Sequence, residues 1–465
     1  MTTTLLATLT DLLGPDAVLT GDDAQGHLTD WSGRFTGAAL AVVRPASTQQ
    51  VADVVRACVA AAVAVVPQGG LTGLVGGAVP APGTDAVVVS LTRMRRIREL
   101  DAVAGTVVAD AGVVLADLRE AVDAAGWQFP ISLGSEGTAT IGGIVSTNAG
   151  GTAVLRHGMT RDLVLGLEVV LPDGRTWHGL RTLRKDNTGY DLKQLFVGAE
   201  GTLGIVTAAA LRLVPATPHR ATALVALPDI ASAVDLLTIL RTHAGDRVTA
   251  WEVMSHTAFD LVLTHLPGAR SPFDRAHAWY GLVEIAGTEV SVTDQLEAAL
   301  GEAMEGPATD AVVASAGAQT DRLWALREGI SEAQRVEGLS IKHDVTLPID
   351  ALADFVEVTA LRLDEALPGV RLVTYGHIGD GNLHHNLSGP PGDDGALREH
   401  AAQLTAVVYD EVTARGGSIS AEHGVGVLKR EAVARTKDPV EIDLMRTVKR
   451  ALDPQGMCNP GKVIV

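Results

Sequence analysis

Residues 375–386 hold an Asp-Gly pair at positions 380–381, between two runs that contain histidines. Because Asp-Gly pairs favour two-residue hairpin turns, residues equidistant from the pair should face one another across two antiparallel strands. His377 then lies directly opposite His384, with Cβ atoms roughly 4.5–5.5 Å apart, near enough for both imidazoles to bind one metal ion. Asn386 returns to the same face two residues further on. The spacing predicts either a metal site that needs a third ligand, or a polar hairpin with solvated histidines.

The composition excludes several classes of protein. The chain has 465 residues, of which 46% are hydrophobic, and this is enough for two or three domains with substantial cores. Its net charge of -18 opposes binding to nucleic acids and to anionic membranes. The start lacks the basic region of a signal peptide, and no apolar stretch approaches the ~18 residues of a membrane span. We therefore expect a reduced, cytoplasmic, globular protein, in which Cys58 and Cys458 form no disulfide framework.

Five glycines fall within residues 69–77, directly after an apolar run. A loop with so few side chains exposes successive backbone N–H groups, which can form a cradle for the negative charge of a pyrophosphate. The alternative is a flexible surface loop. The spacing does not match the G-x-G-x-x-G of a Rossmann fold, and no acidic residue of that unit follows, so nicotinamide binding is unsupported.

A second concentration of glycines lies at residues 133–151, where small hydroxyl and amide side chains alternate with them. These side chains are Ser135, Thr140, Ser146 and Asn148. The composition suits a flat polar ring system held against the backbone, with hydroxyls and amides at its edge. A plain loop of this length would be unusual inside a compact domain.

Apolar periodicity predicts the regular elements around these loops. The expected strands lie at 39–43, 63–66, 86–90, 105–109, 165–171, 176–180 and 339–347, and the expected helices at 49–61, 114–125, 320–337, 396–415 and 439–452. Ser47 or Thr48 is the expected N-cap of the first helix. Pro215 and Pro218 mark a domain boundary, beyond which strands alternate with helices as in an α+β domain.

Charged residues without local partners stand out in the second half. Arg327 has no acidic residue three or four positions away on its expected helix, so its charge must be met elsewhere. Lys342 lies on the strand that follows. Both are either solvated surface charges or ligands for an anion. Further on, Glu422 and His423 are adjacent on a glycine-flanked loop, where both could reach one site.

Seven motifs together resemble the family of FAD-dependent D-2-hydroxyacid dehydrogenases, which has the flavin fold of vanillyl-alcohol oxidase. They run through nearly the whole chain in the family's order: P-Q-G-G-L-T-G-L-V-G-G, G-G-I-V-S-T-N-A-G-G, L-R-K-D-N-T-G-Y-D-L-K-Q-L-F, G-A-E-G-T-L-G-I-V-T, G-H-I-G-D-G-N-L-H, A-E-H-G-V-G and N-P-G-K. The resemblance is nearest to the members that act on D-2-hydroxyglutarate. It implies an α+β protein with a two-part FAD-binding domain at 1–215, an α+β substrate domain, or cap, at 216–415, and a C-terminal helical segment at 416–465 that returns to the FAD domain.

By this resemblance, residues 69–74 would bind the FAD pyrophosphate through their backbone, and further residues would line the rest of the cofactor. The implied FAD-binding residues are Gly69, Gly70, Leu71, Thr72, Gly73, Leu74, Gly134, Ser135, Thr140, Gly142, Ser146, Asn148, Ile205 and Asn459. Leu71 stands where the family usually has asparagine. In a loop that works through backbone N–H groups, we expect this departure to matter little.

The resemblance also supplies a third metal ligand. It makes His377, His384 and Glu422 the ligands of a catalytic divalent metal, namely zinc, with manganese or cobalt as alternatives. The metal would chelate the substrate's C1 carboxylate and C2 hydroxyl, and His423 would accept the hydroxyl proton while hydride passes to flavin N5. The residues that match the family's substrate positions are Arg327, Ser331, Lys342, Asn386 and His423.

Two cations in an acidic protein favour a substrate with two carboxylates. The resemblance therefore implies oxidation of D-2-hydroxyglutarate to 2-oxoglutarate, or of D-malate. A D-lactate or glycolate dehydrogenase is the alternative within the family, and a non-catalytic flavin or metal binder is the alternative outside it. His423 favours an enzyme, because a binder needs no base. An electron-transfer flavoprotein or a quinone would be the electron acceptor, and a homodimer is one option for the assembly.

Overall fold

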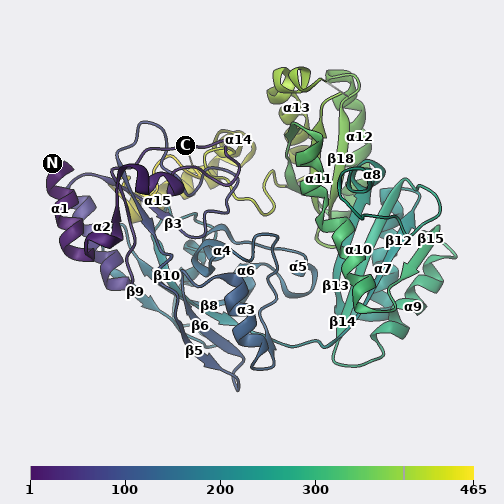
Figure 1. Ribbon diagram of the computed structural model, residues 1–465, viewed down its shortest axis with the longest axis horizontal. Helices are drawn as coiled ribbons and strands as arrows, with labels where there is room; N and C mark the ends of the chain where they lie inside the picture. Colours follow the sequence, from purple (N-terminus) through teal and green to yellow (C-terminus); the bar gives the residue numbers. More distant parts are fainter. Residues whose placement is uncertain (1, 391–392, 465) are drawn as a thin grey trace. The chain divides into compact units, whose positions relative to one another are not determined.

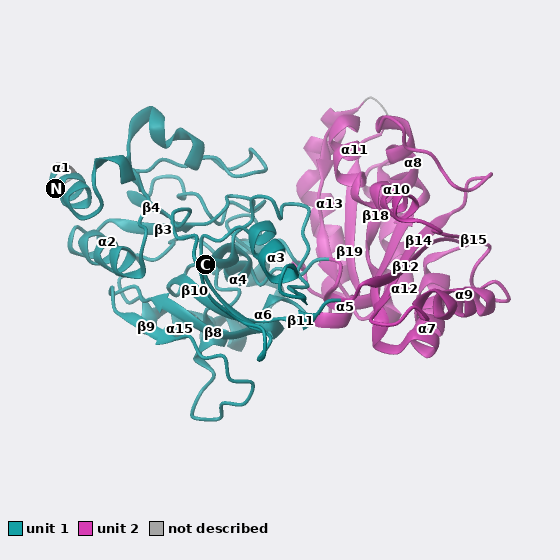
Figure 2. Cartoon of the chain, turned by 60° about the horizontal axis from the view of Figure 1, so that its bottom comes forward, with its two compact units in different colours: residues 1–151, 158–216, 422–465 teal, residues 152–157, 217–421 magenta. Residues whose placement is uncertain are grey.

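The computed structural model describes residues 2–390 and 393–464, which form two compact units (Figure 1, Figure 2). Unit 1 comprises Met1–Gly151, Gly158–Ala216 and Glu422–Val465. Unit 2 comprises Thr152–His157 and Thr217–Ala421. Each unit has a sheet framework and a hydrophobic core of its own.

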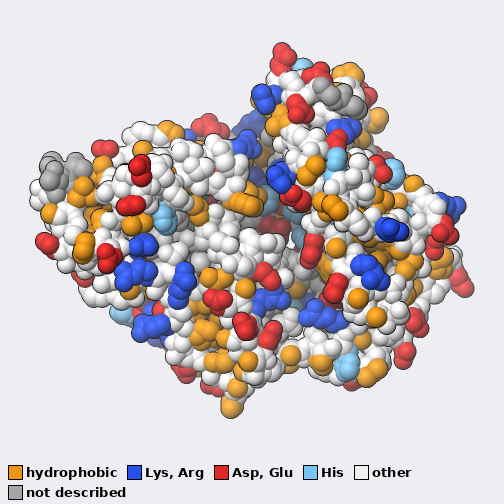
Figure 3. Space-filling model, viewed as in Figure 1, with side chains coloured by type: hydrophobic (Ala, Val, Ile, Leu, Met, Phe, Trp, Pro, Cys, Tyr) orange, Lys and Arg blue, Asp and Glu red, His pale blue; other side chains and the backbone are white. Residues whose placement is uncertain are grey.

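Charged side chains of both signs lie on the surface. On the face shown in Figure 3, acidic and basic groups are interspersed, and apolar side chains occur singly or in small groups. Within the described ranges, none of the helices combines the length and the apolar character that crossing a membrane requires.

The first sheet of unit 1 is built around parallel strands. Its elements are β1 (Val18–Leu19), β2 (Ala41–Val43), β3 (Ala64–Gln68) and β4 (Ala86–Ser90), with α1 (Thr2–Leu13) and α2 (Thr48–Ala60). The spatial order is β1-β2-β4-β3, with β1 antiparallel to β2 and the other neighbours parallel. The two helices lie side by side and share one apolar core with the sheet (Figure 1). As predicted, Ser47 caps α2, by accepting a hydrogen bond from Gln50 N.

The second sheet of unit 1 is antiparallel and holds the larger core. In spatial order its strands are β5 (Ile97–Asp101), β6 (Thr106–Asp110), β10 (Ile205–Arg212), β8 (Val164–Val170) and β9 (Thr176–Gly179). Three helices, α3 (Leu115–Asp123), α4 (Ile141–Thr147) and α6 (Thr160–Leu163), share the core on one face. The remaining elements of the unit are β7 (Trp127–Gln128), β11 (Val214–Pro215), α14 (Arg430–Thr436), α15 (Pro439–Leu452) and the short 3-10 helices η1 (Pro15–Ala17), η2 (Gly21–His27) and η3 (Leu192–Leu195).

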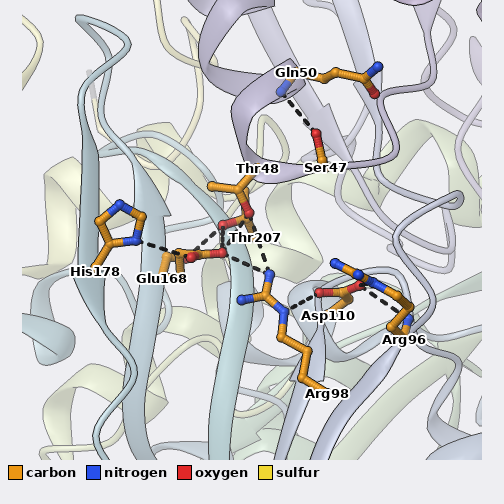
Figure 4. Close-up of polar contacts among 9 residues, drawn as sticks. All are labelled: Ser47, Thr48, Gln50, Arg96, Arg98, Asp110, Glu168, His178 and Thr207. Atoms are coloured by element: carbon orange, nitrogen blue, oxygen red, sulfur yellow. Dashed lines mark hydrogen bonds and ion pairs between the residues drawn. The ribbon is translucent and has the colours of Figure 1, made fainter.

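A network of side-chain hydrogen bonds and ion pairs lies on that sheet beside the first turn of α2 (Figure 4). Glu168 on β8 accepts hydrogen bonds from Arg98 Nη2 (2.9 Å) and from Thr48 Oγ1 (2.6 Å), while Asp110 accepts from Arg98 Nε (2.6 Å). Burial alone would raise the pKa of Glu168, but the hydrogen bonds and the charge of Arg98 together lower it to about 2. Ionised groups therefore tie α2 to the antiparallel sheet.

Unit 2 is built on one antiparallel sheet. In spatial order its strands are β15 (Asp310–Val313), β12 (His219–Leu227), β14 (Trp279–Gly287), β13 (Val248–Ser255), β18 (Arg371–His377), β19 (Asn382–Ser388) and β16 (Ser340–Ile341), and β17 (Asp344–Thr346) also pairs with β19. On one face, α8 (His256–His265), α10 (Gly317–Glu328) and α11 (Ile330–Glu337) form an apolar core with the central strands. The other elements are α5 (Val154–His157), α7 (Ile230–Ala244), α9 (Val292–Ala303), α12 (Leu352–Ala366), α13 (Asp394–Ala414), η4 (Gly245–Arg247), η5 (Ile349–Ala351) and η6 (Ile378–Asp380).

Two predicted elements of unit 2 are interrupted. The helix expected at 320–337 is broken at Gly329 into α10 and α11. A Cβ atom on Gly329 would lie 2.4 Å from Leu266 Cδ1, just past α8, and 2.9 Å from Ala325 O, so the chain is closely packed at the break. The strand expected at 339–347 is divided into β16 and β17, with Lys342 between them. Two short strands, β16 and β17, therefore pair with β19 of the hairpin in place of one long strand.

Candidate functional site

The glycine loop of residues 69–74 follows β3 in unit 1. Within the described ranges, none of its six backbone N–H groups donates a hydrogen bond to another residue. A Cβ atom on Gly70 would lie 2.0 Å from Thr138 O, and one on Gly69 would lie 2.4 Å from Thr140 Oγ1. Close packing thus requires glycine at both positions. The loop offers a series of backbone donors, which is the chemistry that a pyrophosphate needs.

Leu71 in this loop has a left-handed backbone, with φ at +54°. Residues with a Cβ rarely adopt that conformation, and asparagine tolerates it better than leucine. The family's usual asparagine is therefore suited to the backbone at this position. The departure at Leu71 concerns loop conformation as well as the side chain, which the sequence alone did not reveal.

Two buried polar atoms of implied FAD residues have no hydrogen-bond partner among the described residues: Thr140 Oγ1 and Asn459 Oδ1. Asn459 Nδ2 is engaged, since it donates to Gly77 O (3.0 Å) and to Glu200 O (2.7 Å). Buried polar groups are rarely left without a partner in a complete protein. Together with the glycine loop, these orphaned oxygens fit a ligand with phosphates and polar ring edges, such as FAD.

The other implied FAD residues gather around α4 in the same unit. Gly134 and Ser135 precede α4, Gly142 and Ser146 lie on it, Asn148 is its left-handed C-cap, and Ile205 begins β10. A Cβ atom on Gly142 would lie 2.6 Å from Ala111 Cβ, so this helix packs directly against the end of β6. Asn148 Oδ1 accepts a hydrogen bond from Arg161 N (2.9 Å). The side-chain oxygen of Asn148 is therefore engaged inside the protein.

Glu200 holds the loop that begins with Glu422 and His423. Its Oε1 accepts a hydrogen bond from Val425 N (2.6 Å), and its Oε2 accepts one from Gly426 N (2.9 Å). Burial raises the pKa of Glu200 against the lowering effect of these two bonds. Glu200 was not among the predicted site residues, although it lies within the motif G-A-E-G-T-L-G-I-V-T.

Glu422 and His423 are the first residues of the segment by which the chain returns to unit 1. Glu422 Oε1 accepts a hydrogen bond from Gly151 N (2.8 Å) of the same unit. The two histidines of the implied metal site, His377 and His384, belong to unit 2. The three-residue ligand set therefore stays a prediction.

The hairpin histidines share one face of the sheet of unit 2, but they are not opposite one another. β18 and β19 are joined by η6 and a left-handed Gly381, and the register pairs Tyr375 with His384. The prediction of a two-residue turn with His377 opposite His384 is wrong, because the wider loop is fixed by a hydrogen bond from Leu347 N to Gly381 O (3.0 Å). A shift of two residues keeps each side chain on its face. The ring centroids of the two histidines lie 5.7 Å apart.

The third histidine of this segment, His385, points to the opposite face. Its Nδ1 lies 2.9 Å from Thr374 Oγ1 and its Nε2 lies 3.1 Å from Thr359 Oγ1. Burial, with a smaller effect of His343, lowers the pKa of His385 to about 3. His385 is therefore a neutral core residue, in contrast to its neighbour His384.

Glu252 on β13 links His377 to Arg327, and the sequence analysis missed it. This carboxylate is fully buried. Its Oε1 lies 2.6 Å from His377 Nδ1, and its Oε2 accepts from Arg327 Nε and lies 2.8 Å from Arg327 Nη2. Burial alone would raise the pKa of Glu252, but the charges of His377 and Arg327 lower it to about 2. The charge of Arg327 is therefore met elsewhere, as the lack of a local acidic partner indicated, by a glutamate from a distant strand.

Tyr375 gathers three of the predicted substrate residues. The guanidinium carbon of Arg327 lies 4.8 Å from the centre of its ring. Its hydroxyl lies 3.1 Å from Ser331 Oγ and accepts a longer contact from Asn386 Nδ2 (3.5 Å). The ring of His384 is also close, with centroids 4.8 Å apart. One face of unit 2 thus brings together Arg327, Ser331 and Asn386.

Lys342 is the predicted substrate residue that has no ion-pair partner among the described residues. Its side chain is exposed, although partial burial lowers its pKa. Nearby in the chain, the buried Asp344 has its Oδ1 3.8 Å from His384 Nδ1 and accepts a hydrogen bond from Asn382 Nδ2 (3.0 Å). Asp344 is a further acidic neighbour of the histidine pair that periodicity did not reveal.

Comparison with known proteins identifies the family of this chain. A family model described as "FAD binding domain" matches residues 39–179, and one described as "FAD linked oxidases, C-terminal domain" matches residues 216–463. A mitochondrial D-2-hydroxyglutarate dehydrogenase of Arabidopsis thaliana is 40% identical over 438 residues, which cover 94% of this chain and 77% of the relative. A putative mitochondrial D-lactate dehydrogenase of Schizosaccharomyces pombe is 37% identical over 458 residues, which cover 95% and 85%.

Among solved structures, p-cresol methylhydroxylase with substrate bound aligns with a TM-score of 0.78 at 18% identity, over 99% of this chain and 96% of that chain. The protein is thus a flavoprotein with an FAD-binding domain of the vanillyl-alcohol-oxidase type. It belongs to the FAD-linked oxidase family and is an FAD-dependent D-2-hydroxyacid dehydrogenase. The fold class and the family expected from the sequence motifs are confirmed.

Proposed function

We propose that this dehydrogenase oxidises a D-2-hydroxyacid with two carboxylates, namely D-2-hydroxyglutarate to 2-oxoglutarate, or D-malate. Lys342 supports this proposal most directly, because it is a cation without an ion-pair partner among the described residues of a protein with net charge -18. Arg327 supplies a second cationic group on the face with Ser331 and Asn386. The Arabidopsis relative, named as a D-2-hydroxyglutarate dehydrogenase, supports the same substrate.

The chain would hold its cofactor mainly through unit 1. FAD, when bound, supplies at N5 the acceptor for the hydride that leaves substrate C2. The backbone N–H groups of residues 69–74 would bind its pyrophosphate charge. Thr140 Oγ1 and Asn459 Oδ1 would meet its polar edges, since both atoms lack a partner in the described protein.

We further propose His377, His384 and Glu422 as ligands of a divalent metal. Two imidazoles and one carboxylate form a donor set typical of catalytic zinc, and manganese or cobalt could also use it. Such a metal, when bound, would lower the pKa of the substrate's C2 hydroxyl. The pair of histidine rings, 5.7 Å apart by their centroids, supports this assignment.

The proposed proton acceptor is His423. It takes the proton of the C2 hydroxyl, and C2 loses a hydride, so that the hydroxyacid becomes a 2-oxoacid. Arg327 would contact a substrate carboxylate through Nη1, because Nε and Nη2 already face Glu252. Lys342 would bind the second carboxylate as a point charge.

The deciding experiment is anaerobic mixing of the purified protein with D-2-hydroxyglutarate, D-malate or D-lactate, followed by the loss of visible flavin absorbance. It is repeated after treatment with a chelator and after readdition of zinc, manganese or cobalt. Rapid bleaching by a dicarboxylate, abolished by the chelator and restored by metal, is the expected result. Absence of bleaching by every acid in metal-replete protein would overturn the proposal.

A D-lactate or glycolate dehydrogenase is the second candidate, and the name of the Schizosaccharomyces pombe relative favours it. The same experiment separates the two candidates. A monocarboxylate substrate leaves Lys342 without a role in binding, so faster bleaching by D-lactate than by the dicarboxylates would support this second candidate. An electron-transfer flavoprotein or a quinone would then reoxidise the flavin in either case.

A further inference from the structure

We propose, on the basis of the metal and substrate roles proposed for His377 and Arg327, that Glu252 is a positioning residue for both. It fixes which nitrogen of His377 carries the proton, and it fixes which nitrogen of Arg327 faces a substrate. All three residues lie in unit 2, with Glu252 on β13, His377 at the end of β18 and Arg327 on α10. Glu252 lies in none of the seven sequence motifs.

The backbone places Glu252 for this role. β13 and β18 are antiparallel neighbours, and Glu252 is the direct partner of His377 in their register. Directly opposed side chains on one face of such a pair are in reach of one another. Its carboxylate has one oxygen 2.6 Å from His377 Nδ1 and the other 2.8 Å from the guanidinium of Arg327. With no exposure to water, both oxygens are used inside the protein.

The contact with His377 determines a tautomer. A carboxylate beside an arginine only accepts hydrogen bonds, so His377 Nδ1 must carry the proton. In the neutral form of the ring, which metal binding requires, the lone pair is then on Nε2, the atom that a metal ion would bind. A carboxylate behind a ligating histidine fixes the ring orientation and strengthens the ligand, and its loss typically weakens metal binding about 10–100-fold.

The contact with Arg327 determines which end of its guanidinium can face a substrate. Glu252 occupies Nε and Nη2, and the ring of Tyr375 lies beneath the guanidinium. Among the described residues, Nη1 has no partner. The side of the guanidinium that carries Nε is therefore closed to a substrate, whose carboxylate meets Arg327 at its Nη1 end, and Glu252 already balances the charge of Arg327. Recognition of a second carboxylate then depends more on Lys342 than on Arg327.

The test compares Glu252→Gln with Glu284→Gln, a matched change at a buried glutamate on β14 of the same sheet. Glutamine has a single acceptor oxygen, and the charged Arg327 should claim it because charge-assisted hydrogen bonds are stronger. The amide NH2 group then faces His377 Nδ1, which must become the acceptor, and the ring proton moves to Nε2. Glu284→Gln should leave the tautomer of His377 unchanged.

Two measurements on the full-length protein report these effects. Nitrogen-15 NMR of histidine-labelled, metal-free protein identifies the protonated ring nitrogen of His377, whose signals are assigned by their loss in His377→Asn. Zinc titration gives the dissociation constant, which we expect to rise about 10–100-fold in Glu252→Gln and not in Glu284→Gln. If the unchanged protein binds no zinc, the proposed metal site fails, but the NMR measurement still tests Glu252.

A folded Glu252→Gln protein that keeps the proton on Nδ1 and binds zinc with nearly unchanged affinity would overturn the role of Glu252. If this variant does not fold, Glu252→Asp takes its place, because it preserves the charge and the acceptor. The aspartate variant should keep the proton of His377 on Nδ1. Finding that proton on Nε2 would likewise refute the proposal.

Discussion

Replacing Glu168 with glutamine should lower the free energy of unfolding by about 3 kcal/mol near neutral pH. The pKa of Glu168 falls from 4.5 to about 2, and each pKa unit corresponds to about 1.36 kcal/mol. A carboxyl group whose pKa is lower in the folded than in the unfolded chain stabilises the fold above the unfolded value. This contribution is lost as the pH falls from 4.5 towards 2, where the folded carboxylate also becomes protonated.

The assay is urea unfolding of the purified protein and of Glu168→Gln, at neutral pH and at several values down to about pH 3. The difference between the two proteins should be largest at neutral pH and should shrink on acidification. Asp53→Asn is the control, because Asp53 pairs with Arg56 on the exposed side of α2, and exposed pairs contribute less than about 1 kcal/mol. A neutral-pH difference as small as that of the control, or one that does not shrink in acid, would refute the reasoning.

Three further substitutions test the site. Gly70→Ala should weaken FAD binding about tenfold, because its Cβ would meet Thr138 O at 2.0 Å. Gly26→Ala, at an exposed glycine of the same unit with open space around its Cβ, should bind FAD normally, and equal affinities of the two variants would contradict the role of the glycine loop. His423→Asn should abolish turnover while FAD stays bound, and near-normal activity would remove His423 from the mechanism. Lys342→Ala should raise KM for D-2-hydroxyglutarate about 10–100-fold and leave KM for D-lactate nearly unchanged, and equal effects on both acids would count against a carboxylate contact at Lys342.

Local signals predicted the regular elements of the fold well. Ser47 caps α2 as its position before an amphipathic run indicated, and α15 spans Pro439–Leu452 as predicted. At α15 the chain carries its own start signal, since Asp438 caps the helix and proline occupies its first turn. The order of the glycine motifs was equally informative, because it led to the fold class and the family that the comparisons confirm.

Contacts between distant residues explain what the sequence could not predict. Gly329 separates two helices that periodicity joined, at a point where the chain packs closely against Leu266. The partner of Arg327 is Glu252, which is 75 residues away, whereas helical spacing examines only three or four. A wider loop replaces the predicted two-residue turn at Asp380-Gly381, because Leu347 N, just after β17, donates a hydrogen bond to Gly381 O. The metal ligands and the role of His423 stay predictions.

The loop between β18 and β19 has a consequence for how this site can change in evolution or by design. Residues 378–381 form the loop, and β19 pairs with β18 on one edge and with β16 and β17 on the other. Because both edges hold the register of β19, residues inserted into the loop would lengthen the loop and leave His384 on its face. Only a slip of β19 by one residue would exchange His384 with His385, and such a slip would have to break the pairing on both edges. The loop can therefore vary in length while the polar face of the hairpin is retained.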